Sequence, residues 1–208
     1  MAHQNAPTGI MLEAHDTRDR IALFLSKYFS PLFAFIAGQI IAIMNAPELM
    51  EGVRWSLIGV TIQLLPVMVL YEIRLRQGRL SDPEMSNRKE RNEAYLLGGI
   101  SMTIALGVLI YAEAPASIVA LAASFLLVAV LSGIVNVWWK ISMHASAIAA
   151  VATLATMQSR SLGAVFWVLV VLVAWSRLHT RNHTLGQVTA GTICAATVVY
   201  LVYRFIGV

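Results

Sequence analysis

Residues 116–139 read ASIVALAASFLLVAVLSGIVNVWW, an apolar run from Ala116 to Trp139 without a single charged side chain. The hydrocarbon core of a bilayer is about 30 Å thick and needs roughly 20 apolar residues in a helix, so this run predicts a transmembrane helix. The whole chain agrees, since 58% of its 208 residues are hydrophobic and only 12% are charged, whereas soluble domains carry roughly 25% charged residues. With a mean hydropathy of +0.72, the sequence excludes a soluble globular domain and predicts an all-α, polytopic bundle of transmembrane helices.

The same length criterion, applied outward from this run, predicts about seven spans. The fifth and sixth are short, and Pro31 and Pro66 lie inside spans, where we expect them to kink the helices. The first twenty residues are polar and lack the apolar stretch of a secretory signal peptide. We therefore expect a polar tail over residues 1–20 and one transmembrane domain over residues 21–208. The predicted spans are Ile21–Met44, Val53–Ile73, Tyr95–Ala112, Ala116–Trp139, Ala145–Met157, Leu162–Trp175 and Thr184–Val208.

The cations are distributed unevenly between the two sides that seven spans define. The side with the amino terminus holds twelve of the 15 Lys and Arg residues, and the other side holds only Arg54, Arg160 and Arg204. Because positive charge favours cytoplasmic loops, we expect the amino terminus and the first side in the cytoplasm. The basic balance (pI near 9.5) is explained by these flanking charges, so we expect no nucleic-acid partner. The single cysteine, Cys194, excludes an internal disulfide and any multi-cysteine metal site.

Three connections on the cation-rich side carry a similar set of polar side chains. They read SDPEMSNRKERNEAY (residues 81–95), WWKISMHAS (residues 138–146) and SRLHTRNHTLGQ (residues 176–187). Arginine and lysine that converge with histidines on one membrane face predict a site for a phosphate-like oxyanion, because the guanidinium matches the geometry of phosphate oxygens. The small residues of Ala145–Ala155 predict close helix packing, which would bring the second and third connections together. The candidate site residues are Arg88, Arg91, Lys140, Ser142, His144, Arg177, His183 and Gln187.

The order and spacing of these residues resemble the type 2 phosphatidic acid phosphatase superfamily of membrane lipid phosphatases, over about residues 20–205. The third motif of that family is Ser-Arg, five residues, His, three residues and Asp. Here Ser176-Arg177 is followed after five residues by His183, with Gln187 in place of the acid. The second motif, Pro-Ser-Gly-His, corresponds to residues 141–144, which read Ile-Ser-Met-His.

The first motif of the family, Lys, six residues and Arg-Pro, is matched only in part. Glu84 stands seven residues before Arg91, and Asn92 follows that arginine. The chain looks most like a divergent branch with sequences such as Asp-Arg-Lys-Glu-Arg, Lys-Ile-Ser-x-His and His-Thr-x-x-Gln. In that branch a glutamine at the last place is ordinary.

The resemblance implies a metal-independent phosphatase without a cofactor, acting on a membrane lipid or prenyl phosphate such as an isoprenoid pyrophosphate or a phospholipid phosphate. His183 would attack phosphorus and form a phosphohistidine, and His144 would protonate the leaving group. Gln187 would take the place of the acid that orients His183; a neutral amide fixes the tautomer but stabilises the imidazolium less than a carboxylate does. The phosphoryl oxygens would be held by Arg88, Arg91, Lys140, Ser142 and Arg177.

Several of these residues also have a plainer interpretation. Arg177 and Arg181 can be charges that flank a span, and His144 on its own is typical of a helix cap or an interface. His179 has no place in the motif. The alternative for the whole chain is a protein of the same fold that no longer catalyses and that binds lipid or partner proteins in a membrane complex. A transporter is disfavoured, because no pair of Gly/Pro-broken helices lies at matching places in two halves.

Overall fold

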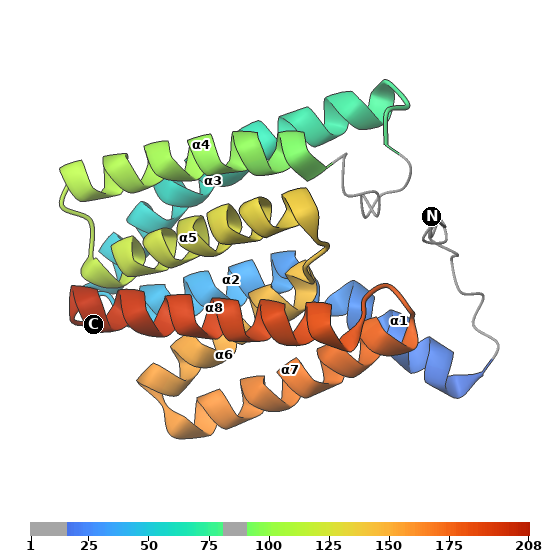
Figure 1. Cartoon of the computed structure of the whole chain (residues 1–208). Coiled ribbons are helices and arrows are strands. Elements are labelled where there is room, and N and C mark those ends of the chain that lie inside the picture. The colour runs from blue at the N-terminus through green and yellow to red at the C-terminus, as the bar shows by residue number, and fades with distance from the viewer. Residues whose placement is uncertain (1–15, 81–90) are drawn as a thin grey trace.

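The computed structural model describes residues 16–80 and 91–208, apart from the side chains of residues 91, 92 and 94. Within these ranges all regular structure is helical, and the helices run roughly along one direction (Figure 1). An all-α bundle is therefore confirmed for the described residues. The helices are α1 (Thr17–Tyr28), α2 (Pro31–Met44), α3 (Leu49–Arg76), α4 (Arg91–Tyr111), α5 (Ala116–Trp138), α6 (Met143–Gln158), α7 (Arg160–His179) and α8 (Leu185–Ile206).

The first predicted span is divided into two helices, α1 and α2, which meet at an angle of 50°. Pro31 is at the start of α2, and the Oγ of Ser30 caps this helix by accepting from the N–H of Phe33 at 3.4 Å. A proline has no N–H to continue the preceding helix but fits the first position of a new one. Pro31 thus bends the chain by breaking the helix, and α1 itself begins at Thr17, inside the predicted tail.

Within the described ranges, four helices are long and apolar enough to cross a membrane: α3, α5, α7 and α8. The bent pair α1–α2 adds a fifth if it forms one span. These helices expose large apolar side chains such as Leu57, Val168 and Phe205, as helices in contact with lipid do. The bundle is therefore compatible with an integral membrane protein. Only four or five of the described spans meet the criterion of length and hydropathy, so the seven spans predicted from the sequence are not confirmed.

The centre of the bundle is α6, which packs mainly against α7 and α8 and also against α2. All residues of Ala145–Ala155 except Ala147 are buried. Small residues allow the backbones to approach closely: a Cβ atom added to Gly191 of α8 would lie 2.7 Å from Oγ of Ser146 and 2.9 Å from the carbonyl oxygen of Ser142. The predicted close packing along α6 is confirmed.

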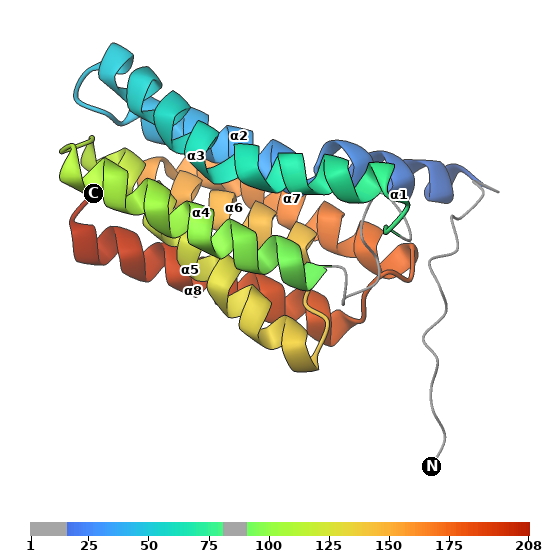
Figure 2. The same cartoon turned by 90° about the horizontal axis from the view of Figure 1, so that it is seen from above.

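The two ends of the bundle differ in what they carry. The ends of α3, α5 and α7 and the beginnings of α4, α6 and α8 lie at one end, on the right in Figures 1 and 2. The opposite end holds the α4–α5 and α6–α7 connections and the carboxyl terminus. The second and third connections of the candidate site therefore share one end of the bundle.

Candidate functional site

His183 and Gln187 meet at the beginning of α8. The side chain of His183 is buried, and its Nδ1 lies 3.1 Å from Oε1 of Gln187. The same oxygen accepts from the backbone N–H of Thr184 at 3.2 Å. Because a backbone N–H only donates, this bond identifies the amide atom as the oxygen, and an amide oxygen only accepts. The proton of a neutral His183 is therefore on Nδ1, and Nε2 carries the lone pair.

The start of α8 holds Gln187 in this position. Thr184 is the N-cap residue, and its Oγ1 accepts from the backbone N–H of Gln187 at 3.4 Å. Together with the bond from the Thr184 N–H to Gln187 Oε1, this forms a capping box, which satisfies N–H groups that have no partner inside the helix. One glutamine thus both begins the helix and orients the histidine.

The second connection is attached to the third by two bonds. The N–H of Ser142 donates to the carbonyl of Gln187 at 3.4 Å, and Nζ of Lys140 donates to the carbonyl of Asn182 at 3.0 Å. Ser142 is fully buried and caps α6, since its Oγ accepts from the N–H of Ala145 at 3.4 Å. The Lys140 ammonium is therefore bound to the backbone of Asn182, the residue directly before His183.

Ser26 of α1 joins His144 to Arg177. Nε2 of His144 lies 3.2 Å from the carbonyl oxygen of Ser26, so this nitrogen donates. Arg177 is only 3% exposed, and its Nη1 donates to Oγ of Ser26 at 3.1 Å. The backbone N–H of His183 donates to the carbonyl of Arg177 at 3.3 Å. The structure thus links both candidate histidines and the buried arginine in one network.

The direction of the serine bonds follows from their partners. Ser176 donates to the carbonyl of Ala22 at 2.7 Å, and the Oγ atoms of Ser26 and Ser176 are 2.7 Å apart. The single hydroxyl hydrogen of Ser176 is donated to the Ala22 carbonyl. The hydroxyl of Ser26 therefore donates to Oγ of Ser176 and accepts from Arg177. Ser26 is not among the site residues predicted from the sequence, because no motif includes it and its partners Ser176 and Arg177 lie about 150 residues away in the chain.

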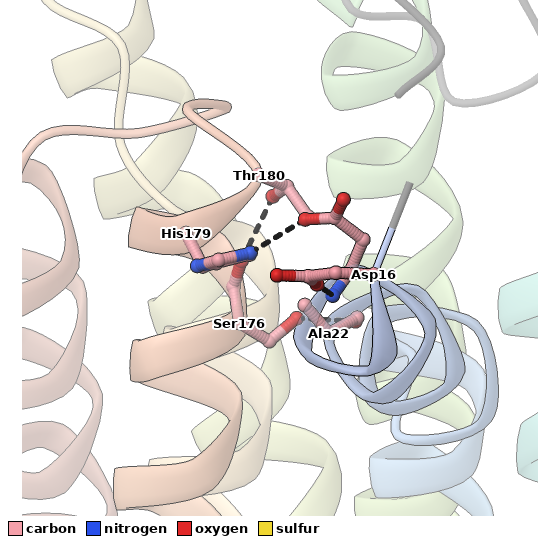
Figure 3. A network of polar contacts seen from close by, with 6 residues as sticks. Asp16, Ala22, Ser176, His179 and Thr180 are labelled. Carbon is pink, nitrogen blue, oxygen red and sulfur yellow. Dashed lines mark hydrogen bonds and ion pairs between the residues drawn. The ribbon is translucent and has the colours of Figure 1, made fainter. Parts of the chain in front are cut away.

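The first helix, α1, also contacts α7 through a hydrogen bond between side chains. Nε2 of His179 lies 2.8 Å from Oδ1 of Asp19, and the His179 ring stacks on Trp175 with ring centres 5.1 Å apart. Figure 3 shows His179 and Ser176 of α7 facing Ala22 of α1 and Asp16, the N-cap residue of α1. His179, which has no place in the motif, contributes to this interface between helices.

Most of the first connection, residues 81–90, lies outside the described residues. Arg88 lies outside the described residues, and Arg91 is the first residue of α4, with an undescribed side chain. At the same end of the bundle, Nε and Nη2 of Arg74 bind the two carboxylate oxygens of Glu93 at 2.8 and 2.9 Å. This ion pair fixes the start of α4 on the end of α3, and the expected contacts of Arg88 and Arg91 with phosphate remain predictions.

Within residues 16–80 and 91–208, no three His, Cys, Asp or Glu side chains lie together as a metal site. No family model, curated protein or solved structure matches this chain. The function is therefore inferred from the motif residues and from the geometry of the site.

Proposed function

We propose that this chain is a membrane-embedded phosphatase that hydrolyses a lipid phosphate or diphosphate through a phosphohistidine at His183. One observation carries the proposal: Nδ1 of His183 donates to Oε1 of Gln187, so the lone pair of the neutral ring is on Nε2. A histidine nucleophile oriented by a third group is the arrangement expected for covalent catalysis. The spacing of Ser176-Arg177, His183 and Gln187 supports the same function through its resemblance to type 2 phosphatidic acid phosphatases.

The reaction proceeds in two displacements. In the first, Nε2 of His183 attacks phosphorus, the bond from phosphorus to the leaving oxygen breaks, and that oxygen takes a proton from protonated His144. The proton comes from Nδ1 of His144, because its Nε2–H is held by the Ser26 carbonyl. In the second, a water oxygen attacks phosphorus and gives a proton to His144, while the N–P bond breaks and phosphate is released.

The basic residues bind and stabilise the phosphoryl group. Arg177 is buried beside His183 in the network described above, and Lys140 is attached to Asn182. Cations in a site with little water interact strongly with the charge that develops on phosphoryl oxygens. Arg88 and Arg91 from the first connection and the Ser142 region complete the proposed phosphate site.

We place this site on the cytoplasmic face, with about seven crossings of the chain. The support is the distribution of cations in the sequence, together with the arrangement of α4, α6 and α8, which all begin at one end of the bundle. A substrate would then be presented on the inner leaflet. An isoprenoid pyrophosphate or a phospholipid phosphate fits this requirement.

Phosphate release by the purified protein in detergent tests the function. The substrates are a panel of prenyl diphosphates and phospholipid monophosphates, and His179→Ala is the matched control for His183→Ala. We expect release by the wild type and by His179→Ala and none by His183→Ala, while His144→Ala slows the expulsion of poor leaving groups most. Full activity in both His183→Ala and His144→Ala contradicts the mechanism.

The second candidate is a non-catalytic subunit of the same fold that binds lipid or partner proteins in a membrane complex. It is favoured by the role of Gln187 in the capping box of α8, which explains this residue without catalysis. Under this alternative the wild type releases no more phosphate than His183→Ala on any substrate. The protein then copurifies with other membrane proteins.

A further inference from the structure

A cavity of about 290 Å³, partly open at the surface of the bundle, lies between α2, α3, α4, α5 and α6. Its lining includes Met143 and Ala150 of α6, Ser132 and Phe125 of α5, and Gln63 of α3. Since α6 begins at the site end of the bundle, Met143 is at the near end of the cavity and Ala150 is deeper. Because α3 and α5 end where α6 begins, Ser132 lies near the site, and Phe125 and Gln63 lie further from it, at the deep end of the cavity.

The cavity is long enough for an extended chain. Met143 and Ala150 are seven residues apart on one helix, and a rise of 1.5 Å per residue gives a length of about 10 Å. Most of the lining is aliphatic or aromatic, and none of the described lining residues is charged. A phosphate group would have no cation here, so the cavity differs in chemistry from the proposed phosphate site.

Gln63 is the polar group at the deep end. It is 2% exposed, and among the described residues its Oε1 has no hydrogen-bond partner. The amide of Gln39 in α2 differs, since its Oε1 accepts from Oγ of Ser56 at 2.9 Å. Buried carbonyl oxygens nearly always have a donor, and in a membrane no bulk water supplies one. The Oε1 atom of Gln63 is therefore available to accept a hydrogen bond from a molecule bound in the cavity.

We propose that this cavity is a binding site for a single-chain lipid alcohol, whose apolar chain fills the cavity and whose hydroxyl donates to Oε1 of Gln63. The apolar lining matches the chain, the absence of lining charge excludes a phosphate headgroup, and the unpartnered oxygen matches one O–H group. The site is separate from His183, and its occupation does not depend on the proposed hydrolysis.

Photoaffinity labelling in lipid nanodiscs tests this site. The probe is decanol with a diazirine on its chain, and the competitors are unlabelled decanol and decane. We expect adducts on cavity residues of α4, α5 or α6, competed by decanol but not by decane. Gln63→Leu should weaken labelling about fivefold, as loss of one hydrogen bond predicts, whereas Gln39→Leu leaves it unchanged.

A pair of glycines in α4 gives a matched steric control. Gly99 lines the cavity and Gly107 does not, and a Cβ atom on either meets no heavy atom within 4 Å. Gly99→Leu should abolish labelling and Gly107→Leu should leave it intact. Adducts outside the cavity, equal competition by decane, or labelling that is indifferent to Gln63→Leu would each overturn the proposal.

Discussion

His183 and His144 each bind, through one ring nitrogen, an oxygen that can only accept. Gln187 Oε1 takes the Nδ1 proton of His183, and the Ser26 carbonyl takes the Nε2 proton of His144. The two rings are therefore held as opposite tautomers when neutral. In the proposed reaction this leaves Nε2 of His183 to attack phosphorus and Nδ1 of His144 to exchange a proton with the leaving group.

Replacing Gln187 by glutamate tests the role of the neutral amide. The glutamate keeps the length of the side chain and an acceptor for both His183 and the Thr184 N–H, and it adds a charge that stabilises the imidazolium. Hydrogen bonds to charged groups are stronger by roughly 1 kcal/mol, so we expect kcat for phosphate release to rise by about fivefold. Gln187→Leu, which loses both bonds, is the control and should be slower than the wild type. A folded Gln187→Glu variant with lower kcat would contradict this role.

Ser26→Ala tests whether α1 positions the buried arginine. The change removes the acceptor for Arg177 but leaves the backbone carbonyl that binds His144. Loss of one hydrogen bond is worth about 1 kcal/mol, so we expect kcat/KM to fall about fivefold. Ser26→Thr keeps the hydroxyl and should restore most of the activity. Equal kcat/KM for Ser26→Ala and the wild type, measured as phosphate release, would exclude this role.

At the scale of helices, the site depends on the contact between the beginnings of α6 and α8. Gly191→Ala places a Cβ atom 2.7 Å from Oγ of Ser146 and 2.9 Å from the carbonyl of Ser142. The helices must separate, and such overpacking costs about 1–3 kcal/mol. We expect a lower melting temperature in detergent and lower phosphate release. Gly107→Ala is the control, since its Cβ atom meets no heavy atom within 4 Å, and it should behave like the wild type. Equal melting temperatures for Gly191→Ala and Gly107→Ala would contradict the tight contact.

Local signals in the sequence predicted some of these elements and missed others. The charge-free run that becomes α5 and the small residues of α6 predicted helices and close packing, since length and side-chain volume act locally. His183 and Gln187 are four residues apart, so their contact follows from the start of one helix. Ser26 could not be predicted, because its role depends on packing between α1 and α7. Pro31 predicted a bend but not its angle.

At the scale of the whole molecule, the proposed function requires that the described site residues face one side of the membrane. Gln77 and Glu48 are exposed and lie at opposite ends of α3, and the Gln77 end carries the site. In a Cys194→Ser background, we expect a membrane-impermeant maleimide to label Gln77→Cys only from the cytoplasmic side and Glu48→Cys only from the other. Labelling of both from the same side would contradict the proposed crossing of α3.

Detection of the covalent intermediate tests the central claim most directly. Purified protein is mixed with an excess of a prenyl diphosphate or phospholipid phosphate that it hydrolyses in the phosphate-release assay. The reaction is quenched in base, in which phosphohistidine survives, and the peptides are analysed by mass spectrometry. The proposed mechanism predicts phosphate on His183 in the wild type and none in His183→Ala. Substrate turnover without phosphate on His183, or phosphate on another residue, would contradict it.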